Sequence, residues 1–159
     1  MIIKLVLVTL QIGFIKNSID NSSLIMTQIN NPKTRLLLVE DDEFMQAILE
    51  EILTANYHID IRPDGLSAMS FLQSGNIPDL IISDLNTPNM NGLELIQQLK
   101  VSDFFRTLPI MILSGEESSD KRIKCLDAGA DDFVIKPFNP AELEARIKMV
   151  LRRAGKNLL

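Results

Sequence analysis

Four short and largely apolar runs, each followed by a polar side chain, place the strongest constraint on how this chain can fold. The runs occupy positions 36–39, 80–83, 110–113 and 133–135, and the polar residues that follow them are Glu40 and Asp41, Asp84, Ser114 and Lys136. Apolar runs of this length, separated by helical patterns, predict buried parallel strands. Because ligands bind outside the carboxyl ends of the strands in an open parallel sheet, we expect these polar residues to meet in one pocket.

Five strand-then-helix units are predicted between Lys33 and Arg153. The expected strands are 35–40, 57–62, 80–84, 109–114 and 133–135, and the expected helices are 43–54, 66–72, 92–101, 118–127 and 140–153. Such alternation requires right-handed crossovers and covers both faces of a parallel sheet with helices. The chain is therefore predicted to be an α/β protein with a five-stranded, doubly wound parallel sheet, and we adopt the strand order 2-1-3-4-5 of flavodoxin-like folds.

The helix predicted for 43–54 is amphipathic, and Asp42 is placed to cap its N-terminus. The apolar residues expected together on its core-facing side are Phe44, Ile48, Leu49, Ile52 and Leu53. The strand predicted for 57–62 alternates with polar residues, which favours an edge position in the sheet.

Composition excludes several classes of function. The 159 residues suffice for one domain of ordinary size. A net charge of -5 provides no basic face for binding a phosphate backbone, so we expect no direct contact with nucleic acid. Because Cys125 is the single cysteine, the chain cannot form an internal disulfide, which fits a reducing cytoplasm. His58 is the single histidine, so a zinc site is not expected. Cys125 is interpreted as a small apolar helix residue.

The first 33 residues are interpreted as an extension to the domain at 34–155. Positions 1–15 are largely apolar but too short to span a membrane, and no convincing cleavage site follows them. Positions 17–33 are rich in Asn and Ser and read as a linker. We favour a true start of translation at Met26, with an added strand, an anchor or a signal as the alternatives. No output domain is expected after the last helix.

The carboxylates at the strand ends favour a metal site. Two acids end the first strand and a third ends the third strand, and their mutual repulsion is best relieved by a hard divalent cation. For Mg²⁺ we expect Asp41 and Asp84 as direct ligands, Glu40 through water, and the backbone carbonyl of Asn86. Helix capping is the ordinary role of acids after a strand, but it does not account for Asp84, which a loop follows.

Ser114 and Lys136 add a hydroxyl donor and a fixed cation, which are what transfer of a phosphoryl group to Asp84 still requires. Taken singly, each has an ordinary explanation, as a turn residue or a solvated lysine. Their order along the chain together with the acid pair and Asp84 favours the joint chemical role. The Lys136-Pro137 bond has a raised chance of being cis.

From about Lys33 to Arg153 the sequence resembles the receiver domain of two-component response regulators. The segments LLLVEDD, DLIISDLNTPNMNG, MILSG and AGADDFVIKPF carry the resemblance. It implies that Asp84 is the phosphoacceptor that becomes 4-aspartylphosphate, that Glu40 and Asp41 are the metal pair, and that Ser114 and Lys136 sense the phosphoryl group. It also makes Phe133 the switch aromatic, for which plain core packing is the alternative. Three departures are mild: Thr87, Asn91 and Gly115 stand where the family often has Met, Asp and Ala.

The resemblance implies partners as well as chemistry. The donor would be a sensor histidine kinase or a histidine phosphotransfer protein, and the response would alter the face formed by 118–127, 133–135 and 140–153. That face would control a downstream protein partner and could also form a homodimer. The protein would catalyse only its own phosphorylation and dephosphorylation. Asn86, Gly115 and Glu116 are expected to tune the lifetime of the phosphorylated state, because they leave water an open approach to Asp84.

Three other classes of function fit the sequence less well. A Mg²⁺-dependent aspartyl phosphatase would use the same nucleophile but normally has a second Asp where this chain has Asn86. A flavin-binding domain needs a phosphate loop after the first strand, where this chain has the acidic residues 40–43. An interaction module independent of phosphorylation would be expected to lack some of the five polar residues.

Overall fold

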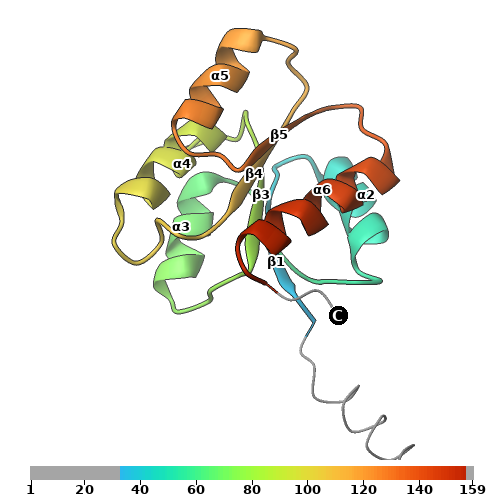
Figure 1. Cartoon of the computed structure of the whole chain (residues 1–159), viewed down its shortest axis with the longest axis horizontal. Coiled ribbons are helices and arrows are strands. Elements are labelled where there is room, and N and C mark those ends of the chain that lie inside the picture. The colour runs from blue at the N-terminus through green and yellow to red at the C-terminus, as the bar shows by residue number, and fades with distance from the viewer. Residues whose placement is uncertain (1–32, 157–159) are drawn as a thin grey trace, which may run out of the picture. The chain divides into compact units, whose positions relative to one another are not determined.

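The computed structural model describes residues 33–156, in which strands and helices alternate along the chain (Figure 1). The elements are β1 (Arg35–Val39), α2 (Glu43–Leu53), β2 (His58–Arg62), α3 (Gly65–Gln73), β3 (Leu80–Asp84), α4 (Gly92–Val101), β4 (Ile110–Ser114), α5 (Ser119–Asp127), β5 (Asp132–Ile135) and α6 (Pro140–Arg153). Most bounds agree with the expected ones to within a residue. The expectations for the extension at 1–33, including a start at Met26, concern almost entirely residues outside the described part.

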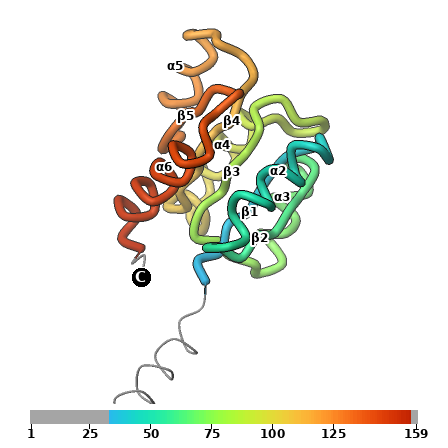
Figure 2. Tube along the Cα trace, turned by 90° about the vertical axis from the view of Figure 1, so that its right-hand side faces the viewer, coloured from blue at the N-terminus to red at the C-terminus, as the bar shows by residue number. Residues whose placement is uncertain are grey.

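The strands form one parallel sheet in the order β2-β1-β3-β4-β5, which confirms the predicted fold class and strand order. Asp84 pairs with Leu113, and Ser114 pairs with Ile135, at the carboxyl ends of their strands. Figure 2 shows α5 beside the β5 end of the sheet, away from β2. This register brings the residues that follow β1, β3, β4 and β5 to the same edge.

Two apolar layers hold the sheet between its helices, because successive strand residues point to opposite faces. Leu36 and Leu38 belong to one layer, which α2 and α6 cover. Leu37 and Val39 belong to the other layer, which α3, α4 and α5 cover. Figure 1 shows the same division, with α2 and α6 on one side of the strands and α3, α4 and α5 on the other. The central strands are buried on both faces, as parallel strands require.

Local signals set the ends of the helices. Asp42 caps α2 by accepting from Phe44 N–H, and Pro140 lies in the first turn of α6, as the sequence predicts. The expectation for Phe44 was wrong, because its side chain is 72% exposed. Phe44 shares a face with Ile48, but it lies in the first turn of α2, past the carboxyl end of β1, where no sheet remains to cover it.

Two further expectations concern single positions in the fold. Cys125 is buried in α5, in agreement with its interpretation as a small apolar helix residue. The Lys136-Pro137 peptide bond is cis. None of the helices described in residues 33–156 has the length and apolar character needed to cross a membrane.

Candidate functional site

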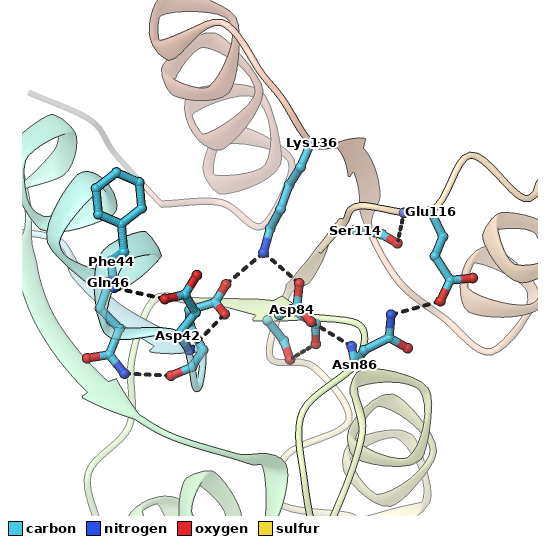
Figure 3. Close-up of polar contacts among 10 residues, drawn as sticks. Asp42, Phe44, Gln46, Asp84, Asn86, Ser114, Glu116 and Lys136 are labelled. Carbon is cyan, nitrogen blue, oxygen red and sulfur yellow. Dashed lines mark hydrogen bonds and ion pairs between the residues drawn. The ribbon is translucent and has the colours of Figure 1, made fainter.

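The carboxyl edge of the sheet brings Glu40, Asp84 and Lys136 into direct contact. Figure 3 shows the side chain of Lys136 extending to Asp84. Lys136 Nζ donates to Glu40 Oε2 at 2.7 Å and to Asp84 Oδ1 at 2.6 Å. Both carboxylates are buried, with 3% of Glu40 and 8% of Asp84 exposed. They follow or end the neighbouring strands β1 and β3, while Lys136 follows β5. Three segments that are distant in the sequence therefore converge on one ammonium group.

Burial and charge have opposite effects on the pKa values of Glu40 and Lys136. Burial raises the pKa of Glu40, and the ammonium of Lys136 opposes this effect without cancelling it. Burial alone would lower the pKa of Lys136, but its hydrogen bonds to Asp84 and Glu40 outweigh that effect and raise the Lys136 pKa. Lys136 is therefore firmly cationic at neutral pH. A fixed charge of this kind suits stabilisation of negative charge that develops on a neighbouring group.

The second oxygen of Asp84 is held by the loop that follows β3. Asn86 N–H donates to Asp84 Oδ2 at 2.6 Å, and the Asn86 side chain donates to Glu116 Oε1 at 2.9 Å. Glu116 also pairs with Lys121, and these two contacts lower the Glu116 pKa, with Lys121 as the larger cause. The Glu116 N–H donates to Ser114 Oγ at 3.0 Å. Asp84 is thus linked to the loop after β4 through Asn86 and Glu116.

The loop between β3 and α4 is fastened to the start of α3 by contacts that the sequence did not reveal. Asp64, which caps α3, accepts from Asn89 Nδ2 at 2.6 Å and from Ser67 N–H at 2.7 Å. The Gly65 N–H donates to Met90 O at 3.0 Å. A Cβ added at Gly65 would lie 2.7 Å from the same oxygen, so the close approach requires glycine. In the sequence, Asp-Gly before a helix indicates a turn but not these contacts.

The remaining expected residues occupy different environments. The Asp41 side chain is exposed. Within residues 33–156, no three His, Cys, Asp or Glu side chains lie close enough together to hold a metal ion. Glu40 and Asp84 share the Lys136 ammonium, which relieves the repulsion that had suggested a three-carboxylate cluster.

Phe133 is buried, with 8% of it exposed, and packs in the layer under α3, α4 and α5. Gly115 has free space around it, since a Cβ added there would meet nothing within 4 Å.

The family model of the response regulator receiver domain matches residues 36–148. The chain belongs to the response regulator receiver family. Among curated relatives of this receiver, the response regulator ArlR of Staphylococcus saprophyticus is 40% identical over 128 residues, which make up 79% of this chain and 56% of ArlR. The receiver therefore spans about half the length of that relative. It is a signalling domain of two-component systems.

Solved structures agree with the receiver assignment. A receiver domain of a signal transduction histidine kinase from Syntrophus aciditrophicus is 34% identical with a TM-score of 0.70, over 76% of this chain and 91% of that one. The Mn²⁺-bound form of the response regulator Rcp1 is 28% identical with a TM-score of 0.62, over 75% of this chain and 90% of that one. The second structure shows that a receiver of this fold can bind a divalent cation.

Proposed function

We propose that this receiver accepts a phosphoryl group on Asp84 from a phosphohistidine of a sensor histidine kinase or a histidine phosphotransfer protein. An Asp84 carboxylate oxygen attacks phosphorus, an O–P bond forms, and the N–P bond of the phosphohistidine breaks. The histidine nitrogen leaves with the bonding electron pair and is protonated. The product is 4-aspartylphosphate, a covalent intermediate of the acyl phosphate class.

The observation that carries this proposal is the shared Lys136 ammonium. Lys136 Nζ lies 2.6 Å from Asp84 Oδ1, so a phosphoryl group transferred to Asp84 would arrive beside a fixed positive charge. Asn86 N–H holds the other carboxylate oxygen and orients the group for attack. Ser114 Oγ is buried at the end of β4 and is the hydroxyl donor that we assign to the transferred group.

The oxygen donors at this edge are of the kind that Mg²⁺ prefers, although residues 33–156 contain no ready-made cluster of three carboxylates. Glu40 and Asp84 already lie within hydrogen-bond distance of one cationic group, and Asp41 follows Glu40 with an exposed carboxylate. We assign Asp41, Asp84 and the backbone carbonyl of Asn86 as direct ligands and Glu40 as a ligand through water. When bound, Mg²⁺ would neutralise charge on the phosphoryl oxygens.

The output that we assign to this receiver is a change in the face formed by α5, β5 and α6. Ser114 would turn toward the phosphoryl group, the loop after β4 would follow it, and Phe133 would move into the space that is released. A local charge event would thereby alter a surface that a downstream protein reads in the cytoplasm. The same face is the one through which we expect a homodimer to form.

Incubation with acetyl phosphate and Mg²⁺, followed by intact-mass measurement, tests the proposal. We expect a mass gain of one phosphoryl group that is absent from Asp84→Asn, because the amide keeps the shape of the side chain and loses its nucleophilicity. Asp103→Asn is the matched control, since Asp103 is an exposed residue after α4. Label on the Asp84→Asn protein would refute the assignment of the phosphoacceptor.

The same experiment distinguishes this function from two others. Continuous consumption of acetyl phosphate without accumulation of modified protein would indicate an aspartyl phosphatase. No modification under any condition would indicate an interaction module independent of phosphorylation. The amide of Asn86 argues against the phosphatase, because it cannot serve as the general acid that such enzymes place two residues after the nucleophile.

A further inference from the structure

A cavity of about 200 Å³ opens between the loop that follows β3, the start of α4 and α5. Its lining residues are Leu85, Asn86, Asn91, Leu93, Lys121, Lys124 and Cys125. Asp84, Ser114 and Lys136 are not among them, so the cavity is distinct from the site of phosphoryl transfer. The two share one boundary, the residue Asn86.

The lining has an apolar side and a cationic rim. Leu85 is buried, Leu93 is half-buried, and Cys125 is fully buried with a thiol pKa that burial raises, so the thiol is neutral. Lys121 and Lys124 are exposed at the rim. Lys121 pairs with Glu116, whereas Lys124 has no ion pair with any residue that the structure describes. A ligand that fits both sides must be amphipathic and anionic.

We propose that this cavity binds a small carboxylate with a ring or branched alkyl body, of about the size of benzoate. An apolar cavity of about 150 Å³ is large enough for benzene, so this cavity can hold such a body beside Leu85, Leu93 and Cys125. The carboxylate would then meet the ammonium of Lys124 at the rim. A neutral molecule of the same shape would leave that charge without a partner.

Occupation of the cavity would act on the phosphorylation site through Asn86. The main chain of Asn86 holds Asp84 Oδ2, and its side chain is bound to Glu116 (Figure 3). A ligand against Asn86 would cover one flank of the path by which water approaches Asp84. This regulatory step rests on the proposed phosphoacceptor function, but binding to the cavity does not.

Titration of the protein with benzoate, followed by backbone amide NMR, tests the binding site without any phosphorylation. We expect saturable shifts confined to the lining residues and their neighbours, which are Leu85, Asn86, Asn91, Leu93, Lys121, Lys124 and Cys125. Lys124→Met should weaken binding by about tenfold, because one charge-assisted contact is lost. Leu93→Phe should also weaken it by filling the cavity. The matched control is Lys148→Met on α6, where the lysine pairs with Glu144 away from the cavity.

Benzamide serves as the neutral probe and should bind less tightly than benzoate by a similar factor. Shifts that do not saturate, or that Lys124→Met and Leu93→Phe leave unchanged, would overturn the proposal.

The regulatory step has its own test. If benzoate binds, its addition should slow the decay of phosphorylated protein about twofold or more through exclusion of water, and Lys124→Met should remove that effect. Binding without any change in decay would refute the regulatory step and leave the binding site in place. If benzoate binds but acetyl phosphate does not modify the parent protein, the phosphoacceptor function would be refuted and the binding site would stand.

Discussion

The two loops that flank Asp84 differ in how firmly they are held. The loop from β3 to α4 is fastened at several points: Asp64 accepts from Asn89, Gly65 N–H donates to Met90 O, and Thr87 Oγ1 also donates to Met90 O. It ends in a capping box between Asn91 and Glu94 at the start of α4. The second half of the loop is therefore fixed by hydrogen bonds to the start of α3 and to α4.

The loop from β4 to α5 has fewer restraints. Ser118 is the N-cap residue of α5, but its side chain makes no capping hydrogen bond. Gly115 lies in open space, and Glu116 supplies the side-chain contacts of the loop, to Asn86 and Lys121. Within α5 itself, Cys125 is the buried residue. Few apolar contacts and exposed hydrogen bonds are the physical signs of a segment that opens at low cost.

This difference assigns different tasks to the two loops. If Asp84 is the phosphoacceptor, as proposed, the fastened loop would keep Asp84 and Asn86 in the geometry that attack on phosphorus requires, since small displacements of a reacting group are expensive. The weakly held loop can follow a new ligand of Ser114 without breaking the fold. We therefore expect the response to phosphorylation to begin on the β4 side of the site, and substitutions in the two loops should separate stability from signalling.

Adding one methyl group at Gly65, the first residue of α3, which packs against the β3–α4 loop, and one at Gly115 in the β4–α5 loop should give the largest contrast. In Gly65→Ala the new Cβ would lie 2.7 Å from Met90 O and 2.8 Å from Met90 Cγ. We expect a loss of about 2 kcal/mol or more in the free energy of unfolding, because backbone must shift to relieve the overlap. Gly115→Ala, with nothing within 4 Å, should change it by less than about 0.5 kcal/mol. Urea unfolding at pH 7 measures both, and equal midpoints would contradict the comparison.

Removal of the Asp64 carboxylate should have the next largest effect. The Ser67 N–H, followed by the Asn89 amide, holds the pKa of Asp64 below its ordinary value. Its contribution is therefore complete above the unfolded-state pKa of about 4 and is lost as the pH falls through the lower folded-state pKa. Asp64→Ala should cost about 1–2 kcal/mol at pH 7, and the difference from the parent should shrink below pH 4. Urea unfolding at pH 7 and pH 3 checks this, and a difference independent of pH would show that the charge of Asp64 is not involved.

The sequence was sufficient to predict the strand ends. Asp84, Ser114 and Lys136 each end or follow an apolar run, and parallel strands must bring such positions to one edge. The local pattern could not show how far each acid is buried. Glu40 is 3% exposed whereas its neighbour Asp41 is exposed, because adjacent residues at the end of a strand point in different directions.

Contacts between distant loops also could not be predicted from the sequence. Asp64 and Asn89 are 25 positions apart, and Asn86 and Glu116 are 30 positions apart. Neither pair follows a helical or strand period, so no local signal predicts it. Phe44 failed for a related reason, since the helical pattern identifies a face but does not reveal that the sheet ends before the first turn of α2.

Access of water to phosphorylated Asp84 provides a test of the open side of the site. Gly115→Val adds bulk where the structure has open space, and Asn86→Met replaces the amide that bonds to Glu116. If water approaches past these residues, each change should slow the loss of phosphate about tenfold, or about 1.4 kcal/mol in the barrier. The decay rate in Mg²⁺, without kinase or phosphatase, measures this. Glu117→Gln is the control in the same loop, and variants that decay as fast as the parent would show that access does not limit hydrolysis.

Removing the two helix caps should give the smallest contrast. Asn91 accepts from Glu94 N–H at 3.0 Å, so Asn91→Ala should cost about 1 kcal/mol in the free energy of unfolding. Ser118→Ala removes a hydroxyl that makes no capping bond and should cost less than about 0.5 kcal/mol. Both replacements introduce the same side chain at the N-cap of a helix, so differences in helix propensity largely cancel. Urea unfolding resolves the pair, and equal costs would mean that Ser118 caps α5 in solution and that the β4 loop is held as firmly as its neighbour.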